Sequence, residues 1–125
     1  MIQRIGMIGT GNMGSAILRG IVEAQYVRAS MITVFDVSAK RMRETEEDIP
    51  GIHLAEDCRE VAEQSDLIII AVKPIYVQDV IDELRSCLNG KAVLSIAAGW
   101  TVQMLEKALA GTGSTYMREI GRAHV

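Results

Sequence analysis

"RIGMIGTGNMGSAILRG", residues 4–20, joins an apolar strand pattern to a helical pattern through three spaced glycines. The strand pattern covers residues 4–9, and small or apolar residues at helical spacing follow. Glycine weakens the interior of strands and helices, so three glycines at this junction indicate a special backbone requirement. Gly9, Gly11 and Gly14 have the spacing G-x-G-x-x-G, which between a strand and a helix predicts a dinucleotide-binding turn.

Each glycine of this turn has a separate task. Gly9 permits the tight turn, Gly11 lets a pyrophosphate approach the backbone, and Gly14 lets the helix pack closely on the strand. Amide groups at the start of the helix then face the phosphates. The alternative is a glycine-rich turn without a ligand. We favour the phosphate site because strand, motif, helix and a following acid occur in order.

That acid is Asp36, which ends the predicted strand "MITVFD" at residues 31–36. It lies about 20 residues past the motif, where a carboxylate can accept hydrogen bonds from the adenosine ribose. A turn residue or helix N-cap explains Asp36 equally well. A carboxylate favours NADH, whereas Ser38, Lys40 and Arg41 could hold the 2′-phosphate of NADPH. For the two basic residues a solvated helix face is the favoured interpretation, so the cofactor stays NADPH or NADH.

The rest of the chain alternates between the two kinds of pattern. Helical patterns cover residues 38–48, 56–64, 75–88 and 101–109, and strand patterns cover 52–54, 66–72 and 91–99. This order predicts an α/β fold, a Rossmann-type doubly wound parallel sheet with helices on both faces. Thr101 is the expected N-cap of the last helix. The first helix is expected to bury Met13, Ala16, Ile17, Gly20, Ile21 and Ala24.

Composition restricts the possible partners. The chain has 125 residues, 49% of them hydrophobic, and a net charge of −3 without a basic block, so we expect no nucleic-acid or membrane partner. The run 67–72 is too short to span a bilayer, and no signal-peptide layout is present, so a cytoplasmic location follows by default. Cys58 and Cys87 lie too far apart for metal spacing, so we expect free thiols and no metal site.

Two more predicted strands end in informative residues. Ala71-Val72-Lys73-Pro74 follows a fully apolar strand, and Ser95-Ile96-Ala97-Ala98-Gly99 ends the next one. Ligands of open parallel sheets bind beyond the carboxyl ends of the strands. If only these residues are considered, a solvated lysine explains the first segment as well as ligand binding does. Close packing of the next helix explains the second segment equally well.

Taken together, "IGMIGTGNMGSAI", "DLIIIAVKP" and "VLSIAAGWT" resemble the N-terminal half of pyrroline-5-carboxylate reductase, over residues 2 to about 118. The resemblance implies reduction of the imine of 1-pyrroline-5-carboxylate to L-proline with NADPH or NADH. It also implies a small imino-acid substrate and a homo-oligomer. Residues 1–118 would form the NAD(P)-binding domain, with the family's C-terminal helical dimerisation domain absent from this chain.

The resemblance also implies where the cofactor lies. Residues 8–13 would hold the pyrophosphate, residues 71–74 would line the nicotinamide side, and residues 96–98 would lie along the nicotinamide and its ribose. With Gly14 and Asp36, the expected cofactor-binding set is Ile8, Gly9, Thr10, Gly11, Asn12, Met13, Gly14, Asp36, Ala71, Val72, Lys73, Pro74, Ile96, Ala97 and Ala98.

The chain departs from the family pattern in several places. Cys58 occupies a position that often carries a cofactor-contacting Asn, and the Met-Pro-Asn-type segment expected after Tyr116 does not follow. A strand-like stretch covers 114–117, and the final "IGRAHV" resembles translated adapter DNA, so 119–125 are expected to be a non-native or disordered tail. No His, Cys or carboxylate demands the role of general acid, and the catalytic residue is unknown.

Since the imino-acid site would lie in the absent domain, we expect the chain to bind a dinucleotide without turning over the imine. Two alternatives remain. The first is the cofactor domain of another two-domain dehydrogenase, related to 3-hydroxyacid or prephenate dehydrogenases. The second is a non-enzymatic module that senses NAD(P), which needs only the phosphate site.

Overall fold

The computed structural model describes residues 3–118. The expectation of a non-native or disordered tail over 119–125 lies outside the described residues. The strand-like stretch at 114–117 is confirmed, because a strand runs from Thr115 to Arg118.

Six strands form a single parallel sheet, as expected. The strands are β1 (Ile5–Ile8), β2 (Ile32–Phe35), β3 (His53–Leu54), β4 (Leu67–Ile70), β5 (Ala92–Ser95) and β6 (Thr115–Arg118). Their order in the sheet is β3-β2-β1-β4-β5-β6, with every neighbouring pair parallel. This order belongs to dinucleotide-binding sheets, and it reverses direction between β1 and β4.

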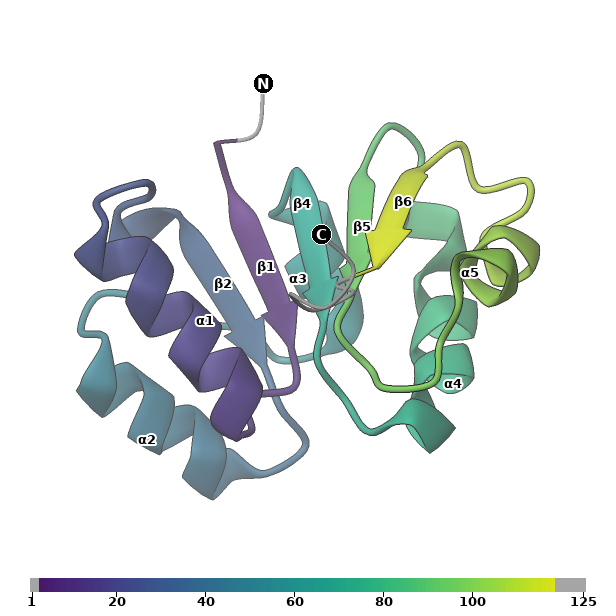
Figure 1. Ribbon diagram of the computed structural model, residues 1–125. Coiled ribbons are helices and arrows are strands. Elements are labelled where there is room, and N and C mark those ends of the chain that lie inside the picture. Colours follow the sequence, from purple (N-terminus) through teal and green to yellow (C-terminus); the bar gives the residue numbers. More distant parts are fainter. Residues whose placement is uncertain (1–2, 119–125) are drawn as a thin grey trace.

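Helices connect the strands in alternation (Figure 1). They are α1 (Asn12–Glu23), α2 (Ala39–Asp48), α3 (Cys58–Glu63), α4 (Pro74–Leu84) and α5 (Val102–Ala108), with short 3₁₀ turns at Ala29–Met31 and Arg85–Cys87. The N-cap predicted for α5 is confirmed, because Thr101 Oγ accepts a hydrogen bond from the Met104 amide. None of the helices within residues 3–118 combines the length and the apolar character that a bilayer crossing requires.

Two buried clusters lie on the two faces of the sheet. In β4, Ile68 and Ile70 belong to the cluster that includes residues of α3, α4 and α5, whereas Ile69 belongs to the cluster that includes Leu18 of α1. Alternate side chains of a strand point to opposite faces, so β4 is buried from both sides. The doubly wound architecture is therefore confirmed.

The predicted core face of α1 is partly wrong. Gly14 and Leu18 are the buried residues of this helix, and Ile17 and Ile21 are half-buried. Met13, Ala16, Gly20 and Ala24 are exposed. The cause is the contact of Gly14 with β1: a Cβ there would lie 3.0 Å from the Gly9 carbonyl oxygen. This contact turns the helix so that residues spaced from Gly14, and not from Met13, face the sheet.

Candidate functional site at the carboxyl edge of the sheet

The register of the sheet brings the expected segments together. Ile8 of β1 pairs with Phe35 of β2 and with Ile70 of β4, and Ile70 pairs with Ser95 of β5. The residues that follow these four positions therefore leave the sheet side by side. The glycine turn, Asp36, Ala71 and Ile96 thus meet at one edge, beside the point where the strand order reverses.

The three glycines of the turn differ in the space around them: Gly9 and Gly14 are tightly packed against other backbone atoms, whereas Gly11 is open. Gly9 has φ +94°, and a Cβ on it would lie 2.8 Å from the Ala71 backbone. A Cβ on Gly11 would meet only the Arg41 guanidinium, at 3.5 Å. Gly9 and Gly14 are therefore fixed by packing, whereas the missing side chain of Gly11 leaves an approach to the backbone.

The start of α1 offers unsatisfied amide groups at that opening. Gly11 is the N-cap, without a side-chain hydrogen bond to the first turn, and no acidic residue lies in that turn. The first amides of a helix lack partners within the helix, and the helix dipole favours an anion there. The expected phosphate site at residues 8–14 therefore has the required open backbone donors.

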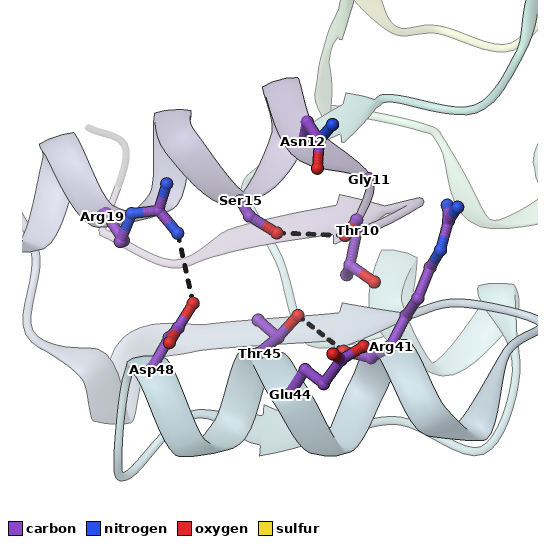
Figure 2. A pocket seen from close by; sticks show the side chains of 9 residues that line it. All are labelled: Thr10, Gly11, Asn12, Ser15, Arg19, Arg41, Glu44, Thr45 and Asp48. Carbon is purple, nitrogen blue, oxygen red and sulfur yellow. Dashed lines mark hydrogen bonds and ion pairs between the residues drawn. The ribbon is translucent and has the colours of Figure 1, made fainter.

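Two clefts of different character border the turn. The first, about 330 Å³, is polar and lies between α1 and α2, as Figure 2 shows. Its lining residues are Thr10, Gly11, Asn12, Ser15, Arg19, Arg41, Glu44, Thr45 and Asp48. Arg19 and Asp48 form an ion pair at 3.1 Å in this cleft. Arg41 also lines it, and its side chain has no hydrogen bond or ion pair to another described residue.

The second cleft, about 550 Å³, is mainly apolar and lies against β1, β2 and α4. Ile8, Phe35, Val37, Val72, Tyr76 and Val80 supply its apolar lining. Asp57, Asp79 and Glu83 also line it. An apolar cleft with a few polar groups fits a flat heterocyclic ring. The carboxylates can accept hydrogen bonds from a ring amino group.

Cys58 begins α3 and lines the apolar cleft. Burial, followed by a hydrogen bond to Glu83, raises the pKa of its thiol to about 12. The thiol is therefore protonated at neutral pH and a poor nucleophile. Cys58 and Cys87 are both free thiols, as expected.

The segments after β4 and β5 lie against each other. The Ala71 amide donates to the Ile8 carbonyl at 2.8 Å, and the Ile96 amide donates to the Ile70 carbonyl at 3.1 Å. Pro74 is the first residue of α4, and Trp100 Nε1 donates to its carbonyl oxygen at 3.0 Å. Trp100 thus joins the loop after β5 to the start of α4.

Exposure differs among the residues of these two segments. Lys73, Pro74 and Ala98 are exposed, and Ala71, Val72, Ile96 and Ala97 are half-buried. Ala97 packs on the α3–α5 face of the sheet, and Ile96 packs on the α1 face. The exposed and half-buried positions form an open surface next to the glycine turn.

Sequence reasoning missed two contributors to this edge, Ser15 and Trp100, and favoured another interpretation of a third, Arg41. Ser15 donates to the Thr10 carbonyl at 3.0 Å, and its only signal was a small polar residue in the first turn of α1. Arg41 was interpreted as a solvated charge, yet it faces Gly11 across the polar cleft. Trp100 carried no signal, because its hydrogen bond reaches a carbonyl 26 residues away.

Comparison with known proteins agrees with this geometry. Residues 4–99 match the family model described as NADP oxidoreductase, coenzyme F420-dependent. The chain is 41% identical over 110 residues to pyrroline-5-carboxylate reductase of Escherichia coli, covering 87% of this chain and 40% of that protein. The resemblance seen in the sequence is therefore confirmed. The chain spans about 40% of the length of the curated relatives it matches.

Solved structures give the same result. A pyrroline-5-carboxylate reductase from Coxiella burnetii superposes with a TM-score of 0.84 at 31% identity, over 93% of this chain and 43% of that one. A Plasmodium falciparum pyrroline carboxylate reductase with NADP bound superposes with a TM-score of 0.76 at 26% identity, over 87% of this chain and 38% of that one.

Proposed function

This chain belongs to the family of NADP oxidoreductases described as coenzyme F420-dependent, and we propose that it is the cofactor-binding part of a pyrroline-5-carboxylate reductase. The whole protein would reduce 1-pyrroline-5-carboxylate to L-proline with NADPH or NADH. The names of the relatives mention pyrroline carboxylate and NADP, so the proposed ligand is a nicotinamide dinucleotide. Residues 1–118 would form its binding domain.

One observation carries the proposal. The three segments that are expected to contact the cofactor, at 9–14, 71–74 and 96–98, leave neighbouring strands at the same edge of the sheet. A dinucleotide laid across β2, β1, β4 and β5 would contact all of them at once.

The residues present fit such a ligand. The open side of Gly11 admits a phosphate to the first amides of α1. The apolar cleft beside Val37, Val72 and Tyr76 has room for the adenine ring. Residues 71–74 and 96–98 would border the nicotinamide and its ribose. The bound cofactor supplies hydride, and this chain's residues orient it and exclude water from one side.

No proton donor is assigned within the chain. The carboxylates that line the clefts lie beside the proposed adenine and phosphate sites. The donor and the imino-acid contacts therefore belong to parts of the protein outside residues 3–118 in this proposal. The homo-oligomer and the cytoplasmic location are part of the same proposal, supported by the resemblance.

Two measurements test the proposal. Titration of the 125-residue chain with NADPH and NADH, followed by cofactor fluorescence, should give saturable binding. The complete product of the gene that encodes these residues should oxidise NADPH or NADH when 1-pyrroline-5-carboxylate is added, and release proline. No binding of either cofactor would exclude the cofactor role. Binding without conversion by the complete product would favour an NAD(P)-sensing module or another dehydrogenase.

A further inference from the structure

Asp36 lies at the end of β2 with both carboxylate oxygens engaged by the protein. Oδ2 accepts hydrogen bonds from the Thr10 amide at 2.8 Å and from the Thr10 hydroxyl at 3.0 Å. Oδ1 accepts a hydrogen bond from the Ser38 amide at 2.8 Å. The residue is only 9% exposed. Asp36 lines the apolar cleft, but each of its two carboxylate oxygens already accepts a hydrogen bond from the protein.

Thr10 is held from a second side as well. Ser15 Oγ, in the first turn of α1, donates to the Thr10 carbonyl, a contact drawn in Figure 2. The amide, hydroxyl and carbonyl of Thr10 are thus all bonded to other parts of the protein. Thr10 lies between Gly9 and Gly11, so this network fixes the turn through which the phosphates would be bound.

The same carboxylate also fixes the start of α2. Ser38, bonded through its amide to Asp36, is the N-cap of that helix and accepts a hydrogen bond from the Arg41 amide at 3.2 Å. One buried carboxylate thereby connects the glycine turn to the start of α2, the helix whose residues line the polar cleft. Hydrogen bonds to an ionised acceptor are stronger than those between neutral groups, so the connection is rigid.

We propose, on the basis of the proposed function, that Asp36 is a positioning residue for the glycine turn and serves NADH and NADPH alike. These three donors use most of the acceptor positions of the carboxylate, so a ribose could not be held by both oxygens, in the manner of a ribose-selecting acid, without displacing Thr10 from Oδ2. Loss of Asp36 therefore weakens both cofactors by the same factor. Selection at the 2′ position then depends on other residues.

The test compares Asp36→Asn with wild type in titrations of the 125-residue chain with NADH and with NADPH. We expect each dissociation constant to rise about tenfold, with their ratio unchanged within about twofold. Thr10→Val removes only the hydroxyl donor and should weaken both cofactors by a smaller factor. When Asp36→Asn and Thr10→Val are combined, the increase in each dissociation constant should be clearly smaller than the product of the two separate increases. The reason is that both substitutions break the same hydrogen-bond network.

Asp66 gives a matched control at the opposite edge of the sheet. Its Oδ2 accepts hydrogen bonds from the amides of Gln3 and Arg4, both at 3.0 Å. Asp66→Asn removes a carboxylate bonded to backbone amides, as Asp36→Asn does, but should leave both dissociation constants unchanged. If Asp36→Asn weakens NADH much more than NADPH, or has no more effect than Asp66→Asn, the positioning role is wrong.

A readout without cofactor separates this proposal from the proposed function. Amide hydrogen exchange in the free chain should show the Thr10 and Ser38 amides protected in wild type and faster in Asp36→Asn. The Ala71 amide, bonded to Ile8, should keep its protection in the variant. Unprotected Thr10 and Ser38 amides in wild type would overturn the positioning role even if both cofactors bind. If the Thr10 and Ser38 amides are protected but the chain binds neither cofactor, the proposed function is wrong. The claim that Asp36 serves NADH and NADPH alike is then wrong as well, whereas the hydrogen bonds of Asp36 to Thr10 and Ser38 are supported.

Discussion

At the scale of single residues, the three glycines of the turn have different physical constraints. Gly9 has a positive φ and contacts the Ala71 backbone, and Gly14 contacts the Gly9 carbonyl. Gly11 has φ −70° as the N-cap of α1, a value open to any residue. The sequence motif treats the three glycines as one signal, whereas only Gly11 is free of a packing or conformational requirement.

Gly11→Ala should therefore separate binding from stability. We expect the free energy of unfolding to stay the same or rise by about 0.4–1 kcal/mol, because alanine restricts the unfolded chain. The added methyl group would block the approach of a phosphate, so the dissociation constant for either cofactor should rise at least about tenfold. Chemical denaturation and cofactor titration measure the two quantities.

Gly20→Ala is the matched control in the same helix. Gly20 is exposed, and a Cβ there meets nothing within 4 Å. The Gly20→Ala substitution should stabilise α1 by about 0.5–1 kcal/mol and leave cofactor binding unchanged. Equal binding by Gly11→Ala and wild type would mean that the phosphates do not approach at Gly11.

Arg41 is the residue that we expect to distinguish NADPH from NADH. Its guanidinium faces Gly11 and lines the polar cleft, without a described side-chain partner. Arg41→Gln should weaken NADPH about five- to tenfold and leave NADH nearly unchanged, since only NADPH carries the 2′-phosphate. Cofactor titrations at low and high salt measure these dissociation constants. The loss of NADPH affinity in Arg41→Gln should become smaller as the salt concentration rises.

Lys40 provides the control for Arg41. It is the neighbouring cation on α2, but it does not line the cleft. Lys40→Gln changes the net charge by the same amount and should alter NADPH binding much less. Equal losses in the two variants would indicate a general charge effect in place of a specific contact.

At the scale of helices and strands, the spacing of apolar residues predicted correctly where helices and strands occur. It was less successful in predicting which face of a helix is buried. The apolar run 66–72 identified β4, because a strand buried on both faces carries no polar residue in its middle. The stripe assigned to α1 was partly wrong, because alanine and glycine were counted as core residues and can equally lie in solvent. The contact between Gly14 and Gly9 fixed the helix rotation, and such a contact is not visible in hydrophobic spacing.

Trp100 connects two elements that both border the proposed nicotinamide site. Trp100→Phe keeps an aromatic ring in the core but removes the donor to the Pro74 carbonyl. We expect a loss of about 1–2 kcal/mol in the free energy of unfolding and a few-fold weaker binding of both cofactors, because the start of α4 is less well fixed. Denaturation and titration by cofactor fluorescence measure these effects.

Val102→Ala tests whether that effect is specific. Val102 begins α5, just after the loop that contains Trp100, and is 45% exposed. Its shortening should change neither stability nor binding by much. A Trp100→Phe variant that loses stability but binds both cofactors as wild type would show that the contact supports the fold alone.

At the scale of the whole molecule, the alternation of patterns predicted the parallel sheet, and chain connectivity explains its order. The hydrogen bonds that polar side chains form with residues distant in the sequence could not be predicted from the sequence. Asp36 reaches Thr10 across 26 residues, and both an N-cap and a ribose acceptor fit its sequence position. Which role a carboxylate has depends on the donors that folding places around it. The resemblance predicted where the cofactor site lies, and the structure shows which of its side chains are bonded to other parts of the protein.

Two surface carboxylates make the stability of the whole molecule depend on acid pH. The Gln3 and Arg4 amides lower the pKa of Asp66, which ties the start of the chain to β4. The Glu56 amide, followed by His53, lowers the pKa of Glu60 on α3. A carboxylate with a lowered pKa in the folded state stabilises that state above its unfolded pKa. The contribution is lost as the pH falls through the lowered value.

We therefore expect the free energy of unfolding to be steady above the ordinary carboxyl pKa range and to fall as the pH decreases below it. Asp66→Asn removes one of the two contributions, so its stability should be lower near neutral pH and should fall less steeply toward acid. Urea denaturation across an acid pH series measures both features. Parallel curves for Asp66→Asn and wild type would mean that the amides of Gln3 and Arg4 do not hold the ionised carboxylate in solution.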